Sequence, residues 1–132
     1  MGRSYNGLMK TPSSIRLHRK SRLLEVGYAD GTRYELPCEY LRVYSPSAEV
    51  RGHSGGETVL VPGKRNVAID KVEPVGSYAV RLTFDDGHNT GLYTWAYLHE
   101  LGTTHAARWQ QYLERLQKLG IPYPTRVAAR KA

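Results

Sequence analysis

Cysteine is nearly absent from this sequence, which has one among its 132 residues. A single thiol excludes an internal disulfide and any zinc or iron–sulfur site built mainly from cysteines. Apolar runs are also short, and none approaches the ~18 consecutive residues that a membrane-spanning helix needs. No signal-peptide pattern opens the chain. We therefore expect a cytoplasmic protein with no membrane segment.

The remaining composition is that of a folded protein, with 40% hydrophobic and 23% charged residues, and its length suits one domain. The net charge is +7, but the basic excess lies in residues 1–22 and 106–132. Residues 23–105 carry eleven acidic and seven basic side chains. A nucleic-acid-binding domain normally has basic residues on its folded face. Specific nucleic-acid binding is therefore not expected, and polyanion binding through the basic termini is the weakest of the functional alternatives.

Apolar patterning predicts mainly strands before residue 94. They are expected at residues 15–17, 23–28, 34–36, 59–61, 67–69, 72–75, 78–84 and 92–93. In the segment 78–84, alternation places Tyr78 on the buried face. The pairs Asp30–Gly31 and Asp86–Gly87 stand between apolar strands and predict hairpin turns, because such turns need a positive φ.

Three helices complete the predicted elements. Residues 37–44 form a short helix opened by a proline, and residues 94–102 form another that ends at Gly102. Residues 103–119 have an amphipathic helical pattern. Its apolar stripe consists of Ala106, Trp109, Leu113, Leu116 and Leu119.

The chain also contains an internal duplication. At an offset of 56, the first Asp-Gly turn matches the second, and one added residue then shifts the offset to 57. There the triplet Cys38, Tyr40 and Leu41 matches Trp95, Tyr97 and Leu98. We expect the Tyr-Leu pairs in the core and Cys38 to be a buried, inert thiol.

Neither repeated unit alone can bury its apolar face, so the two are expected to share one core. The predicted fold is α+β: a small single domain of antiparallel strands with two repeated hairpin-plus-short-helix units and a C-terminal amphipathic helix. The domain is placed at residues 15–120, between a flexible arm at 1–14 and a flexible basic tail at 121–132.

Two long motifs carry a resemblance to a known family. The first hairpin together with YLRVYSPSAEVRGH (40–53) and DDGHNTGLYTWAYLHELG (85–102) resembles the N-terminal domain of gamma-butyrobetaine hydroxylase. Stand-alone bacterial proteins with this domain form the domain-of-unknown-function 971 family. The resemblance covers about residues 15–102 and implies an α+β domain of antiparallel strands. It carries over no oxygenase activity, because the catalytic iron site of the hydroxylase lies in a separate domain.

The resemblance also bears on metal binding. In the hydroxylase this domain holds a structural zinc through three cysteines and a histidine. The matching positions here are Ser45, Ser47, Val50 and His88. Serine and valine do not supply the thiolates of a structural zinc site, so we expect no zinc.

Polar side chains gather in the loop after the first predicted helix and at the second Asp-Gly turn. Loops are where binding residues tend to lie. The resulting candidate interaction patch consists of Arg42, Tyr44, Arg51, His53, Asp86 and His88. Two interpretations remain open: contact with a ligand or partner, or an ion pair from Arg42 or Arg51 that only pins the loop.

The sequence has no nucleophile elbow, phosphate loop or dinucleotide motif, so we expect no enzymatic activity and no cofactor. The leading prediction is an interaction module with a protein partner. Domains similar to this one also occur fused to carrier ATPases of the Mrp type, which implies a role in iron–sulfur protein maturation. The alternative is a small-ligand or metal-sensing domain that uses Arg51, His53 and His88. Self-association is left open.

Overall fold

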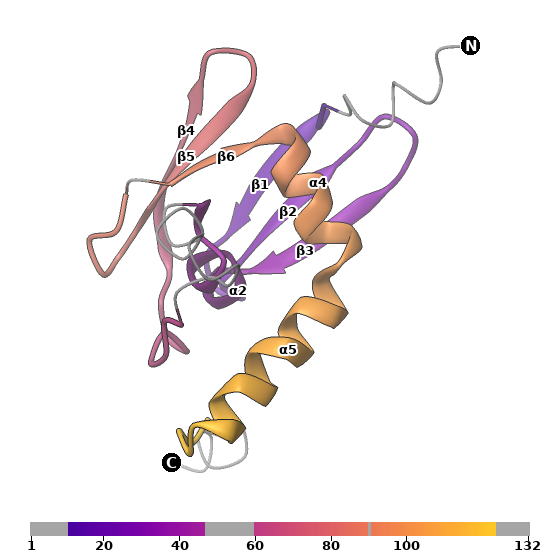
Figure 1. Ribbon diagram of the computed structural model, residues 1–132. Coiled ribbons are helices and arrows are strands. Elements are labelled where there is room, and N and C mark those ends of the chain that lie inside the picture. Colours follow the sequence, from indigo (N-terminus) through magenta and orange to yellow (C-terminus); the bar gives the residue numbers. More distant parts are fainter. Residues whose placement is uncertain (1–10, 47–59, 90, 124–132) are drawn as a thin grey trace.

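The computed structural model describes residues 11–46, 60–89 and 91–123 (Figure 1). Its described part holds two three-stranded antiparallel sheets, ordered β1-β2-β3 and β4-β5-β6. The first unit consists of β1 (Ser14–His18), β2 (Leu23–Gly27), β3 (Arg33–Pro37) and the short helix α2 (Cys38–Val43). The second consists of β4 (Ile69–Val75), β5 (Ala79–Phe84), β6 (Leu92–Thr94) and α4 (Trp95–Thr103), and α5 (His105–Lys118) follows. The predicted α+β fold with two repeated units is confirmed.

The two Asp-Gly turns contain equivalent backbone hydrogen bonds, as the duplication implies. The Tyr28 amide donates to the Thr32 carbonyl at 2.9 Å, and in the second unit the Phe84 amide donates to the His88 carbonyl at the same distance. The central glycines, Gly31 and Gly87, have φ values of 93° and 91°. Both turns therefore use the left-handed backbone that the Asp-Gly pairs predicted.

Two matched tyrosines join the units by reciprocal hydrogen bonds. The Tyr40 hydroxyl donates to the Leu101 carbonyl at 2.8 Å, and the Tyr97 hydroxyl donates to the Tyr44 carbonyl at 2.6 Å. Tyr40 and Tyr97 are 57 residues apart, and so are the two acceptors. Each unit thus satisfies a carbonyl near the end of the other unit's helix. This arrangement explains how two small sheets form one domain.

One core spans both units. Its fully buried side chains come from both sheets and both short helices: Leu24, Val26, Leu36, Tyr40, Leu41, Leu82, Tyr93, Leu98 and Leu101. The predicted core residues Tyr40, Leu41 and Leu98 are confirmed, and Tyr97 packs partly buried against them. Within the described residues, no helix is long and apolar enough to cross a membrane.

Three sequence predictions about local elements are wrong. Tyr78 is 52% exposed, because it lies in the turn before β5 and outside the alternation of that strand. Gly102 lies inside α4, where a Cβ atom would overlap the Tyr34 ring. The glycine is therefore needed for close packing and does not end the helix. Residues 60 and 61, the described part of the expected strand at 59–61, belong to no strand.

The C-terminal helix packs part of the predicted stripe against the core: Leu116 is buried, and Trp109 and Leu113 are partly buried. Ala106 and Leu119 are exposed, whereas Tyr112 and Leu116 are buried. Tyr112 lies three residues after Trp109 and four before Leu116, so helical spacing places it on the same face. Leu116 was in the predicted stripe, and Tyr112 was not.

The domain extends beyond both predicted boundaries. Ser14 is the first residue of β1, and the Ser13 amide donates to the Gly27 carbonyl at 2.7 Å. At the other end, the Tyr123 hydroxyl donates to Glu39 Oε1 at 2.7 Å and its ring packs against Trp109. Residues 121–123 therefore belong to the folded domain and not to a tail, because a long-range contact supplies the partner that local sequence does not show.

Candidate functional site

The end of α2 meets the turn between β5 and β6, as the candidate patch requires. Asp86 is the centre of this contact. Its Oδ2 accepts from Arg42 Nε at 2.9 Å and from Lys64 Nζ at 2.7 Å, and its Oδ1 accepts from the His88 amide at 3.0 Å. The Arg42–Asp86 pair is the loop-pinning contact of the second interpretation. Lys64 was missed, because no local pattern connects it with Asp86.

The surroundings of Asp86 set its protonation. Burial by itself would raise the pKa of this carboxyl. Hydrogen bonds from Lys64, from the His88 amide and from Arg42 outweigh it and hold the pKa well below its usual range. Asp86 is therefore an anion at neutral pH and a poor proton acceptor.

Ser45 and His88 lie in contact, with Ser45 Oγ and His88 Nε2 2.9 Å apart. Ser45 is fully buried, and a Cβ atom on Gly91 would lie only 2.7 Å from its hydroxyl. Two of the four positions matched to the hydroxylase zinc site are thus adjacent, while Ser47 and Val50 lie outside the described residues. Across the described ranges, no group of three or more His, Cys, Asp and Glu side chains could hold a metal ion.

Tyr44, also a member of the predicted patch, contacts α5 and not the turn between β5 and β6. It is 7% exposed, and its hydroxyl donates to the Arg108 carbonyl at 2.8 Å. The Arg108 guanidinium lies 5.3 Å from the centre of the Tyr44 ring and pairs with Glu100 at 2.6 Å. Tyr44 thus anchors α5. The remaining predicted patch residues, Arg51 and His53, lie outside the described residues, so the structure brings together Arg42, Asp86 and His88.

A groove beside Asp86 was not anticipated. It has a volume of about 900 Å³ and lies between the loop 62–67, the inner face of α5 and residues 121–123. We call it the α5 groove, and its lining includes Lys64, Arg65, Val67, Tyr112, Leu116 and Ile121. Its lining comes from segments that are distant in sequence, and only Asp86 and Leu116 were among the residues that the sequence singled out.

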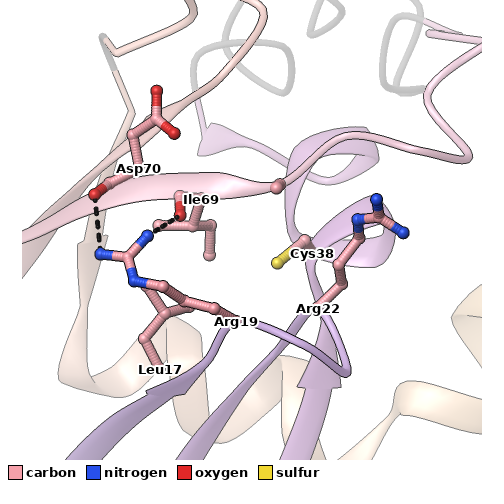
Figure 2. Close-up of a pocket in the computed structure, with 7 residues that line it drawn as sticks. Leu17, Arg19, Arg22, Cys38, Ile69 and Asp70 are labelled. Atoms are coloured by element: carbon pink, nitrogen blue, oxygen red, sulfur yellow. Dashed lines mark hydrogen bonds between the residues drawn. The ribbon is translucent and has the colours of Figure 1, made fainter.

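Cys38 lies at the wall of a small cavity of about 60 Å³ between the two units (Figure 2). The guanidinium of Arg19 closes one side by donating to the carbonyls of Ile69 and Asp70, at 3.3 and 3.2 Å. The thiol is 1% exposed, and burial raises its pKa. The prediction of a buried thiol is confirmed, and the raised pKa agrees with an inert one.

Comparisons with known proteins identify similar chains. A family model described as gamma-butyrobetaine hydroxylase-like, N-terminal, matches residues 15–99. Two solution structures determined by NMR share 48% and 45% identity with this chain, each with a TM-score of 0.74. The first match covers 90% of this chain and 96% of that one, and the second covers 88% and 94%.

A crystal structure from Acidithiobacillus ferrooxidans is also similar. It is of a protein with unknown function in the DUF971 family, with 42% identity and a TM-score of 0.60. The match covers 72% of this chain and 96% of that chain. No curated protein matches.

Proposed function

The chain belongs to the family of gamma-butyrobetaine hydroxylase-like N-terminal domains, and from this premise we propose that it is a non-enzymatic module that binds a protein partner. Family membership by itself supplies no activity, because the Acidithiobacillus relative is a protein with unknown function. The role must therefore be argued from the site.

The observation that carries this proposal is that the polar groups of the patch bind one another. Asp86 accepts from Arg42, from Lys64 and from its own turn, and His88 contacts the buried Ser45. A general acid or base must exchange its proton with a substrate. A carboxylate held by two cations, with a lowered pKa, is unsuited to this exchange. The Lys64–Asp86 pair instead stabilises one wall of the α5 groove.

The α5 groove supplies the surface for the partner. Tyr112, Leu116 and Ile121 give it an apolar floor, and Lys64 and Arg65 stand at its loop side. Apolar surfaces rimmed by polar residues mark sites of interaction with proteins or ligands. The partner class comes from the resemblance to domains fused with Mrp-type carrier ATPases. We therefore propose an iron–sulfur carrier of that type as the protein bound in the groove.

The direct test measures binding of the full chain to the purified Mrp-type ATPase of the same organism, by calorimetry without oxygen. The variant Ile121→Asp places a charge on the groove floor and is expected to weaken binding at least tenfold. Leu119→Asp is the matched control, since Leu119 is 62% exposed and lines no part of the groove. It should bind like the wild type.

Ile121→Asp also lowers the stability of the fold, because Ile121 packs partly buried against the core. Pro122→Asp gives an independent readout, since Pro122 lines the groove but is exposed. No binding by the wild type, or equal weakening by Leu119→Asp, contradicts the proposed partner. Normal activity of iron–sulfur enzymes in a deletion strain would contradict the maturation role.

A further inference from the structure

A second cavity adjoins the α5 groove and lies between the β1–β2 turn and the loop 62–67. It shares Arg65 with the groove, but none of the groove's floor residues Tyr112, Leu116 and Ile121 lines it. We propose that this cavity binds an oxyanion, of the kind carried by phosphate esters and by di- and tricarboxylates. The two residues expected to bind it are Arg22, from the turn, and Arg65, from the loop. The inference is independent of the protein partner proposed above.

The cavity has a suitable size and entrance. Its volume is about 370 Å³, within the range of small-molecule sites. Ser21, Arg22 and Asn66 line it and are exposed, so a ligand in solution can reach both arginines. Hydroxyl and amide groups beside two guanidinium groups form a set of donors that matches the acceptor oxygens of an anion.

Among the described residues, the two arginines line a cavity and have no carboxylate partner, whereas three other arginines of the fold are paired. Arg33, Arg42 and Arg108 each pair with a carboxylate at 3.3 Å or less. Neither Arg22 nor Arg65 has a side-chain hydrogen bond or ion pair within the part of the chain that the structure describes. The Nε atom of Arg65 is buried with no hydrogen-bond partner. A buried donor without an acceptor is unfavourable, and a bound oxyanion would supply the missing acceptor.

The carboxyl group of the same cavity interacts with the charge of Arg65 but forms no hydrogen bond with it. Glu39 lines the cavity, but its Oε1 accepts from the Tyr123 hydroxyl and it makes no ion pair with Arg65. The Arg65 guanidinium lies 6.0 Å from the centre of the Tyr123 ring. This ring contact leaves the donors of Arg65 available to a ligand.

The backbone fixes the position of Arg22. Its φ of 53° is the only positive value among the described residues other than glycine. Its carbonyl accepts from the Cys38 amide at 2.9 Å, which ties the turn to the start of α2. A left-handed arginine is strained, and strained residues cluster at binding sites, where the surrounding structure holds them. The turn thus fixes the backbone from which the Arg22 side chain extends.

Titration of the full chain with inorganic phosphate and with citrate, at constant ionic strength, tests the proposal. The readout is the two-dimensional NMR spectrum, including the Nε–H signals of the arginines and the side-chain amide of Asn66. We expect saturable shifts of these signals with one of the two anions, which also assigns the ligand class. The variant Arg65→Gln should raise the Kd at least tenfold, and Arg22→Gln/Arg65→Gln should abolish saturation.

Arg81→Gln is the matched control, because Arg81 is exposed on β5, lines neither cavity and carries the same charge. It should leave the Kd unchanged. Linear shifts without saturation, or equal weakening by Arg81→Gln, would show that only overall charge attracts the anion and would overturn the proposal. Failure of the wild type to bind the carrier ATPase would leave this proposal standing, because the anion titration is measured without that partner and Ile121 does not line the cavity.

Discussion

Two carboxyl groups beside the loop 62–67 have pKa values displaced in opposite directions. Cationic partners lower the pKa of Asp86 despite its burial. At Glu39, burial raises the pKa, and the hydrogen bond from Tyr123 offsets this only in part. Two carboxyl groups that both line the α5 groove thus make opposite contributions to stability as the pH changes.

This difference predicts opposite pH profiles for two isosteric variants. A lowered folded pKa stabilises the protein above the unfolded value near 4, and this stabilisation is lost as the pH falls. Asp86→Asn should therefore lower the free energy of unfolding by about 1 kcal/mol at pH 7, a value that allows for solvent screening, and by less at about pH 3. Urea unfolding between these pH values measures the effect.

Glu39→Gln should behave in the opposite way. A raised folded pKa costs stability as the pH rises past the unfolded value near 4.3, so removing the charge relieves that cost at pH 7. The variant should be at least as stable as the wild type at pH 7 and show no gain at about pH 3. A gain that grows as the pH falls would contradict the assigned burial effect.

Gly102 gives a steric prediction. Alanine favours a helix over glycine by about 1 kcal/mol, yet here its Cβ atom would overlap the Tyr34 ring. Gly102→Ala should therefore lower the free energy of unfolding by about 1–3 kcal/mol. Urea unfolding in a Tyr34→Leu background provides the control, because the smaller side chain should remove most of the cost. An equal cost in both backgrounds would contradict the packing explanation.

At the level of elements, α2 and α4 are joined through matched tyrosine hydroxyls and carbonyl groups. Each hydroxyl bonds a carbonyl near the end of the other unit's helix. The residue spacing predicted that Tyr40 and Tyr97 occupy equivalent places. The spacing could not show that their hydroxyl groups cross between units, since that requires the two helices to be placed relative to each other.

Removing these hydroxyl groups should destabilise the domain unequally. Tyr40→Phe should cost about 1–2 kcal/mol, because Tyr40 is fully buried and the Leu101 carbonyl loses its partner. Tyr97→Phe should cost less, since Tyr97 is only partly buried. Thermal unfolding measures both, with Tyr78→Phe at an exposed position as the control. A larger cost for Tyr97→Phe would contradict this order.

The C-terminal helix shows the limit of element-level prediction. Its existence followed from the periodicity, but the buried face includes Tyr112 in place of Ala106 and Leu119. The hydroxyl of Tyr112 donates to the Val61 carbonyl at 3.3 Å. An amphipathic pattern indicates which face of a helix is apolar on average. Which residues of that face are buried depends on the elements that pack against it.

At the level of the whole molecule, each unit has its own sheet but no core of its own. Leu24, Leu36 and Tyr40 belong to the same buried cluster as Leu82 and Leu98. A three-stranded sheet needs a covered apolar face to be stable. In this chain the cover comes from the other unit.

The separated halves are therefore expected not to fold. Fragments 1–59 and 60–132 should each give poorly dispersed NMR spectra and little regular secondary structure by circular dichroism. The full chain, measured under the same conditions, is the control. A cooperative unfolding transition in either fragment would show that one unit buries its apolar face unaided.

The sequence by itself determined the features that depend on neighbouring residues. Local backbone preferences account for the Asp-Gly turns, the strands around them and the helical periodicity. The two repeats made it possible to predict the α+β architecture. The resemblance likewise rested on continuous motifs. It matched Ser45 and His88 to positions of one zinc site, and the two residues lie in contact.

The tertiary structure alone decided the features that join distant segments. Lys64 reaches Asp86 across 22 positions, and Tyr123 reaches Glu39 across 84. The α5 groove and the cavity between Arg22 and Arg65 arise from such contacts. No local pattern encodes them, because the energy of a long-range contact depends on where the completed core places both partners.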